Sequence, residues 1–139
     1  MTIEIRYFTK SKKGNTKKLA DCVSKALEKE ALTVDDDLNE KVDTLFLINA
    51  MYAYNVDKRI KKFLERNKDK IGTVYNINSS ASGSSTYKAV KKACDKYNIN
   101  ISDKEFHCRA SWININKNRP NEEDFKNLEE FVLNIVNNN

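Results

Sequence analysis

The chain has 139 residues, the size of one domain, and hydrophobic residues make up 40% of it, which supplies a core and excludes wholesale disorder. No run of about 18 apolar residues occurs, which excludes a membrane span. The first residues lack the layout of a signal peptide, and the three cysteines are widely spaced without a CxxC pair, as in proteins that keep their thiols reduced. We therefore expect a single soluble domain over residues 1–139, located in the cytoplasm.

The charge balance is basic, with 25 Lys and Arg against 20 Asp and Glu. A basic excess is a feature of nucleic-acid-binding proteins, but here the positive residues are scattered and do not alternate with aromatic ones. We therefore expect no nucleic-acid partner. One His is also too few for a metal site built on several histidines.

Short β-rich runs alternate with helical periods along the chain. Residues 2–9 are rich in β-branched and aromatic side chains and predict a first strand, and the polar residues 10–15 predict a loop. Apolar residues recur at helical spacing over residues 19–27 and predict an amphipathic helix. Residues 31–34 predict a second, weak strand.

The middle of the chain repeats this alternation. Residues 42–49 are almost continuously apolar, which is typical of a central strand covered on both faces. Asp57 predicts the cap of a helix, because apolar residues follow at helical spacing between residues 60 and 64. Residues 72–78 predict a fourth strand.

The last third of the chain completes the pattern. The serine-rich residues 79–85 predict a loop that leads into a helix over residues 87–97, and residues 104–112 predict a fifth strand. After Pro120, an acidic first turn and an apolar stripe predict a closing helix. Five alternations of strand and helix predict an α/β fold with a doubly wound, five-stranded parallel sheet.

The first loop at the carboxyl ends of the predicted strands is a candidate binding site, because ligands of such sheets bind there. A helix begins near Asn15, where free N–H groups and the helix dipole favour an anion. Gly14 allows the backbone to approach a ligand closely. The hydroxyls of Thr9, Ser11 and Thr16 are further donors. An ordinary capped helix after a polar loop is the alternative interpretation.

Residues 11–23 resemble the flavodoxin phosphate loop, in which Ser or Thr, two residues, Gly, one residue and Thr are followed by Ala and an aliphatic residue. The resemblance continues in Val42 and Asp43, in the serine-rich loop, and in the helix start at residues 119–124. It implies a flavodoxin-like three-layer sandwich that binds FMN noncovalently and carries single electrons. Such a carrier needs no catalytic acid, base or nucleophile, because its residues only bind, orient and tune the flavin.

The resemblance assigns the FMN phosphate to the first loop. The implied phosphate-binding residues are Thr9, Ser11, Lys12, Lys13, Gly14, Asn15 and Thr16. Thr9 and Ser11 are alternatives for the first hydroxyl, because this loop is one or two residues longer than in many relatives. The two lysines either favour a dianionic phosphate or are simply solvated.

The second loop occupies the place of the first isoalloxazine-flanking loop of flavodoxins. The implied flavin-contacting residues are Ala50, Met51, Tyr52 and Ala53. Tyr52 is the first choice for stacking on the flavin and Tyr54 the second; alternatively, both rings cover the edge of the sheet. The loop has no Gly, which flavodoxins often have there, and its absence argues against strong stabilisation of the one-electron-reduced flavin.

The third loop would meet the pyrimidine edge of the flavin through backbone N–H groups. The implied residues are Asn78, Ser79, Ser80, Ala81, Ser82 and Gly83. This loop has no Tyr that could stack on the flavin, so that face is either more exposed or covered by Trp112. A serine-rich turn without a ligand is the alternative.

Two other functions stay open. An enzyme of the NAD(P)H-linked flavin reductase or quinone reductase type is one, and a flavodoxin fold without FMN that serves as a binding module is the other. Typical flavodoxins are acidic, whereas this chain is basic, so we expect an acidic redox partner protein. We also expect a monomer or weak dimer, and cysteines 22, 94 and 108 that are buried and inert.

Overall fold

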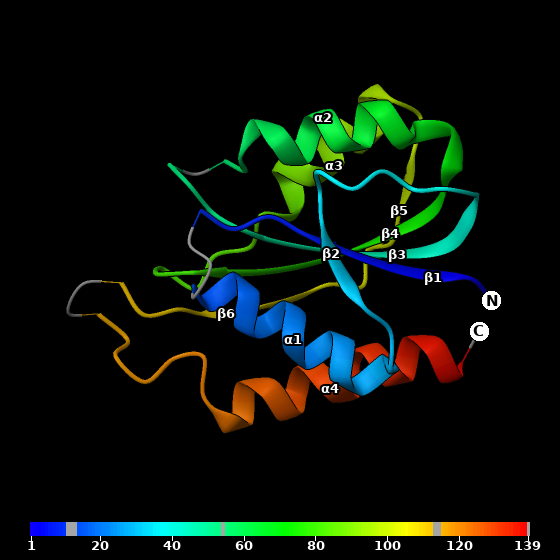
Figure 1. Ribbon diagram of the computed structural model, residues 1–139. Coiled ribbons are helices and arrows are strands. Elements are labelled where there is room, and N and C mark those ends of the chain that lie inside the picture. The colour runs from blue at the N-terminus through cyan, green and yellow to red at the C-terminus, as the bar shows by residue number, and fades with distance from the viewer. Residues whose placement is uncertain (11–13, 54, 113–114, 139) are drawn as a thin grey trace.

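The centre of the molecule is a parallel sheet, seen edge-on in Figure 1. The computed structural model describes residues 1–10, 14–53, 55–112 and 115–138. Its strands are β1 (Ile3–Tyr7), β2 (Ala31–Thr33), β3 (Val42–Ala50), β4 (Ile71–Ser80), β5 (Asn100–Ile101) and β6 (Phe106–Arg109). The strand order is β2-β1-β3-β4-β5, with β6 also paired to β4, and every pair is parallel. The predicted doubly wound sheet is confirmed, and its order reverses between β1 and β3.

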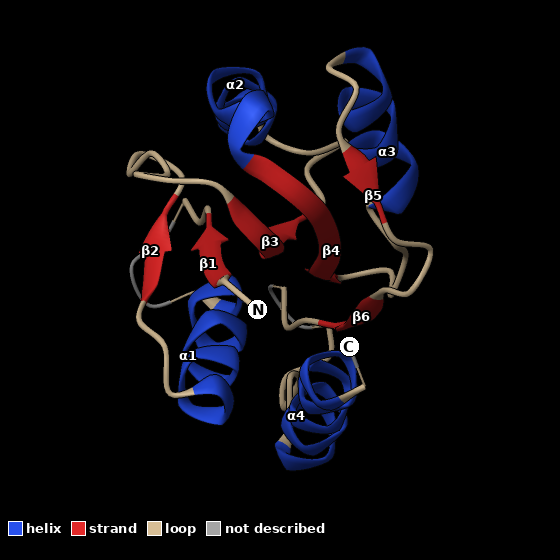
Figure 2. Ribbon diagram, turned by 90° about the vertical axis from the view of Figure 1, so that its right-hand side faces the viewer, coloured by secondary structure: helices blue, strands red, loops and turns tan. Residues whose placement is uncertain are grey.

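Helices cover both faces of the sheet, which makes a three-layer sandwich. Helices α1 (Asn15–Leu27) and α4 (Glu122–Asn137) lie on one face (Figures 1 and 2). Helix α2 (Lys58–Asn67), a single 3-10 turn, η1 (Lys68–Lys70), and helix α3 (Tyr87–Lys96) lie on the other. Over the part of the chain that the structure describes, no helix combines the length and apolarity needed to cross a membrane.

Strand β3 explains why the sheet carries two cores. Its side chains alternate, so that Phe46 and Ile48 are buried with the residues of α1 and α4, whereas Leu45 and Leu47 are buried with those of α2 and α3. All four side chains are fully buried. The continuous apolar run in the sequence is therefore the signature of a strand covered on both faces, as predicted.

The fifth strand differs from the prediction over residues 104–112. Two short strands share that edge of β4: β5 pairs with Thr73 and Val74, and β6 pairs with residues 77–80. Between β5 and β6, the Ser102 N–H still donates to Val74 O of β4 at 2.9 Å, and the Ser102 hydroxyl accepts a hydrogen bond from the Lys104 N–H at 3.1 Å. The sheet therefore has six strands rather than five.

The helix starts follow the local sequence. Asp57 caps α2, and its Oδ1 accepts from the Arg59 N–H at 2.9 Å, as predicted. Helix α4 begins with a capping box in which Asn121 and Asp124 each accept the other's backbone N–H, at 3.0 and 2.8 Å. Helix α1 is different, because its N-cap is Gly14, and no side chain among the described residues caps it. Its first N–H groups are therefore left for another acceptor.

Candidate functional site

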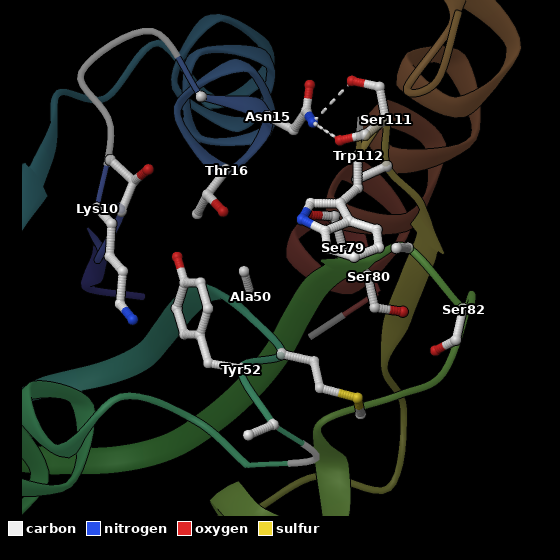
Figure 3. A pocket seen from close by; sticks show the side chains of 16 residues that line it. Lys10, Asn15, Thr16, Ala50, Tyr52, Ser79, Ser80, Ser82, Ser111 and Trp112 are labelled. Atoms are coloured by element: carbon white, nitrogen blue, oxygen red, sulfur yellow. Dashed lines mark hydrogen bonds between the residues drawn. The ribbon is translucent and has the colours of Figure 1, made fainter. Parts of the chain in front are cut away.

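A cavity of about 840 Å³ opens at the carboxyl ends of the strands, next to the point where the strand order reverses (Figure 3). Five segments meet there: the end of β1, the start of α1, and the segments that follow β3, β4 and β6. The lining residues are Thr9, Lys10, Gly14, Asn15, Thr16, Ala50, Met51, Tyr52, Ala53, Ser79, Ser80, Ala81, Ser82, Ala110, Ser111 and Trp112.

The cavity brings together residues from all three loops singled out in the sequence. From the predicted set it is lined by Thr9, Gly14, Asn15, Thr16, Ala50, Met51, Tyr52, Ala53, Ser79, Ser80, Ala81 and Ser82. Asn78 and Gly83 are not among its lining residues. Ser11, Lys12, Lys13 and Tyr54 lie outside the described residues.

The start of α1 forms one wall of the cavity. The first helical N–H with an intrahelical acceptor is that of Lys18, which donates to Gly14 O at 3.3 Å, so the three N–H groups before it have none. The Thr16 side chain is buried, and its hydroxyl bonds to no described residue. Asn15 is held in place instead, because its Nδ2 donates to Ser111 O at 3.1 Å and to Ser111 Oγ at 3.2 Å (Figure 3). This wall offers a positive helix end and a hydroxyl to an anion.

The segment after β3 forms a tight turn beside the cavity. Tyr52 and Asn55 exchange two backbone hydrogen bonds of 2.7 and 2.9 Å, and Ala53 between them has a φ of 50°. The Lys10 ammonium lies 4.2 Å from the centroid of the Tyr52 ring, a cation–π contact. Burial raises the pKa of the Tyr52 phenol, although the hydrogen bond from the Lys10 backbone N–H acts in the opposite direction. Tyr52 therefore presents a neutral, fixed aromatic ring.

The segment after β4 begins later than the sequence predicts. Ser79 and Ser80 belong to the strand, because they pair with Cys108 and Arg109 of β6. In the turn that follows, the Ser82 hydroxyl donates to Ser84 Oγ at 2.9 Å, so its side chain is already used inside the loop.

Backbone donors remain in that turn. Gly83 closes it in a left-handed conformation, with a φ of 81°. The N–H groups of Ala81 and Ser82 donate to no other described residue. Two backbone N–H groups without described acceptors therefore belong to a segment that lines the cavity.

Asn78 has a structural place rather than a place in the cavity wall. It is fully buried, its Nδ2 donates to Ser84 O at 3.0 Å, and its Oδ1 accepts from the Thr86 N–H at 3.1 Å. Both atoms of the side-chain amide are thus engaged in fixing the turn that lines the cavity. Asn78 supports the site from behind.

The sequence did not identify every residue that lines the cavity. Lys10, Ala110 and Ser111 were not expected, and Trp112 was only an alternative cover for the flavin. Trp112 is 59% exposed and lies on a different side of the cavity from Tyr52 (Figure 3). Ala110, Ser111 and Trp112 follow β6 at the carboxyl edge of the sheet, and Lys10 follows β1, so the rule that found the other loops finds them once β6 ends at Arg109.

No protein-family model and no curated protein matches this sequence. Solved structures do match. A flavodoxin from the domain Archaea is 12% identical with a TM-score of 0.76, and the match covers 99% of this chain and 98% of that one. This chain has the flavodoxin-like fold.

Two further matches show how widely the flavodoxin-like fold is used. An NAD(P)H:quinone oxidoreductase from Methanothermobacter marburgensis is 9% identical with a TM-score of 0.66, over 96% of this chain and 94% of that one. A flavoprotein in complex with FMN from Lactobacillus acidophilus NCFM is 16% identical with a TM-score of 0.58, over 78% of this chain and 93% of that one. At identities this low, the structural matches establish a common fold.

Proposed function

We propose that this chain binds FMN in the cavity and acts as an electron carrier. The observation that carries the proposal is the arrangement of one cavity, with an uncapped helix N-terminus on one wall and two aromatic side chains on others. Its volume of about 840 Å³ lies within the range of about 300–1,000 Å³ that small-molecule sites occupy. The FMN bound to the flavoprotein from Lactobacillus acidophilus NCFM, which shares the fold, supports the same cofactor.

The start of α1 is the proposed phosphate site. This wall of the cavity contains three backbone N–H groups without intrahelical acceptors and the positive end of the helix dipole. The Thr16 hydroxyl belongs to the same wall. Gly14 places no side chain in front of these N–H groups. Asn15 braces this wall against the segment after β6 through its hydrogen bonds to Ser111.

The flavin ring would lie between the segments after β3, β4 and β6. Tyr52 and Trp112 supply aromatic surfaces. Ala50 lies between these two side chains in Figure 3, and its small side chain leaves room for a planar group. Ala81 and Ser82 line the cavity, and their N–H groups, which donate to no other described residue, would be the hydrogen-bond donors for ring carbonyl oxygens. When bound, FMN supplies the redox chemistry, and the chain's residues bind and orient it.

A titration of ligand-free protein with FMN and with riboflavin tests the phosphate site. FMN should bind at least about tenfold more tightly than riboflavin, because only FMN reaches the α1 N-terminus. Thr16→Val should weaken FMN binding and leave riboflavin binding unchanged. Thr44→Val is the matched control, because Thr44 is equally buried but lies near the start of β3, away from the carboxyl edge of the sheet where the cavity opens. Equal affinities for the two flavins would contradict the assignment.

The NAD(P)H:quinone oxidoreductase with the same fold supports a second candidate, an enzyme that takes its electrons from NAD(P)H. Mixing FMN-loaded protein with NADH or NADPH without oxygen separates the two functions. Bleaching of the flavin absorbance within seconds would favour the reductase. A carrier should stay oxidised until a reducing protein is added.

A further inference from the structure

Charge is distributed unevenly across the two faces of the sandwich. Helices α2 and α3 and the turn η1 contain eleven Lys and Arg but three Asp and Glu. Helices α1 and α4 contain four Lys and Arg but six Asp and Glu. Because the two helix pairs lie on opposite sides of the sheet, the excess of positive charge belongs to one face (Figures 1 and 2). We call the surface of α2, η1 and α3 the basic face.

Much of this positive charge is unpaired. Six lysines of the basic face are exposed and form no ion pair or side-chain hydrogen bond with any described residue: Lys58, Lys62, Lys68, Lys88, Lys92 and Lys96. Lys91 differs, because its ammonium lies 3.2 Å from the Asp95 carboxylate, and so does Lys70, which donates to Leu38 O at 2.9 Å. Like charges held together without partners repel one another. A negatively charged surface that covers this face therefore lowers the electrostatic free energy.

We propose that the basic face is the docking surface for an acidic protein. The proposal rests on the proposed function, since it assigns the electron carrier the surface that its redox partner contacts. The first two turns of α2 hold Lys58 and Lys62, and those of α3 hold Lys88 and Lys92. Both helices begin at the carboxyl edge of the sheet, directly after the segments that line the cavity. A partner on this face therefore reaches the rim of the proposed flavin site.

The chemistry of the basic face fits a protein better than a nucleic acid. Its two arginines are already engaged: the Arg59 guanidinium lies 5.0 Å from the centroid of the Phe8 ring, and Arg66 pairs with Asp37 at 3.0 Å. The unpaired cations are thus all lysines, whose ammonium groups pair with a carboxylate as point charges and impose no bidentate geometry on the partner. Its three acids are exposed among the lysines and would repel a phosphate backbone, whereas a protein partner can pair with them.

The basic face also lacks the exposed apolar side chains that single-stranded nucleic acids or membranes would contact. Among the described residues, the exposed large hydrophobic side chains are Met1, Trp112 and Ile115, and none belongs to α2, η1 or α3. Stacking on single-stranded bases needs exposed aromatic rings, and insertion into a bilayer needs exposed apolar ones. The basic face offers neither.

A titration of isotope-labelled whole protein, followed by backbone NMR shifts, tests the proposal without FMN. The probes are a glutamate-rich peptide of about 20 residues, a DNA duplex of about 20 base pairs, an oligothymidine, and vesicles containing phosphatidylserine, all at about 0.15 M salt. The peptide should bind, shift the amides of α2 and α3, and weaken steeply as salt rises. The nucleic acids and the vesicles should bind more weakly than the peptide.

Two variants with the same net charge make the test specific. Replacing Lys58, Lys62, Lys88 and Lys92 with Gln should weaken peptide binding about tenfold. The matched control replaces Lys18, Lys25, Lys117 and Lys126, which are exposed on other elements. Both variants lower the net charge from +5 to +1. An equal loss in the control, shifts on α1 and α4 instead, or tighter binding of a nucleic acid or the vesicles would overturn the proposal. Failure of FMN to bind would leave these results unchanged, so it is a separate outcome.

Discussion

Asn49, near the end of β3, donates a hydrogen bond from its Nδ2 to Oδ1 of Asn76 in β4 at 2.8 Å. Thr86 closes a ring with them: its hydroxyl donates to Asn49 Oδ1 at 2.6 Å and accepts from Asn76 Nδ2 at 3.0 Å. All three side chains are buried. The ring joins two strands to the residue that precedes α3, directly behind the segments that line the cavity.

The first prediction concerns this ring. Thr86→Val should lower the free energy of unfolding by about 2 kcal/mol, because it leaves the Asn49 carbonyl and the Asn76 amide without partners in the core. Urea unfolding measures the change. Thr86→Ser keeps the hydroxyl and should retain most of the stability. If Val and Ser behaved alike, the hydroxyl would not be what holds the ring together.

Ala53 leads to a prediction about backbone strain. Its φ of 50° is a left-handed conformation that suits Gly better than Ala. Ala53→Gly should therefore raise the free energy of unfolding by about 1 kcal/mol. Ala50→Gly is the control, because Ala50 ends β3 in an extended conformation, where Gly should destabilise by about 0.5–1 kcal/mol. If Ala53→Gly and Ala50→Gly changed the free energy of unfolding in the same direction, this explanation would be wrong.

Trp112 provides a direct probe of flavin binding. It is the only Trp in the chain and it lines the cavity, so FMN should quench its fluorescence on binding. Trp112→Ala should weaken FMN binding about tenfold through the loss of ring contact, measured by flavin fluorescence. Trp112→Phe keeps a ring and should bind more tightly than the Ala variant. Quenching by FMN without any effect of Trp112→Ala would mean that the ring is near the flavin but does not contact it.

Asp124 predicts how stability depends on pH. Burial raises the pKa of its carboxyl, but the hydrogen bonds from Arg119 and from the Asn121 N–H outweigh burial and hold that pKa below its ordinary value. The carboxylate therefore stabilises the folded chain above the unfolded pKa of about 3.9, and this contribution is lost as pH falls through the lower folded pKa.

The test compares unfolding of the wild type and of Asp124→Asn at pH 7 and below pH 4. The variant should be less stable by about 1 kcal/mol at pH 7, and the difference should shrink in acid. Glu123→Gln is the control at an exposed neighbouring position and should change little. A difference that is the same at both pH values would mean that ionisation of Asp124 plays no part.

The cysteines should be unreactive in the folded protein. Burial raises the pKa of the Cys94 thiol and that of the Cys108 thiol to about 12, and it also raises the pKa of Cys22. Only the thiolate reacts with an alkylating reagent, so at pH 8 labelling should be slow in the native state and complete for all three in urea. Rapid native labelling, located by mass spectrometry, would contradict the burial of that thiol.

The sequence predicted those features that depend on local pattern. The apolar run at Leu45 and its neighbours identified a strand buried on both faces, and Asp57 marked the start of α2, because burial pattern and capping are encoded within one turn or strand. The cavity residues of the first two loops were found in the same way, from their place after a strand.

Features that depend on distant partners were not predictable. Ser79 and Ser80 read as a loop, yet they are strand residues because β6 pairs with them from about 30 residues away along the chain. Ser111 entered the site through its contact with Asn15, which joins two segments 96 residues apart along the chain. Serines in a polar run carry no sign of such a pairing, since the same composition also forms turns.

Strands β5 and β6 pair with the same edge of β4, and the chain between them can accept extra residues. The two strands hold β4 at separate places, and Asp103 and Lys104, which are exposed between them, form no backbone hydrogen bond with β4. Extra residues can enter there without shifting either register, because each strand is fixed by its own pairs. A short Gly-Ser insertion between Asp103 and Lys104 is therefore the place to attach a tag or a fused domain on the edge of this sheet.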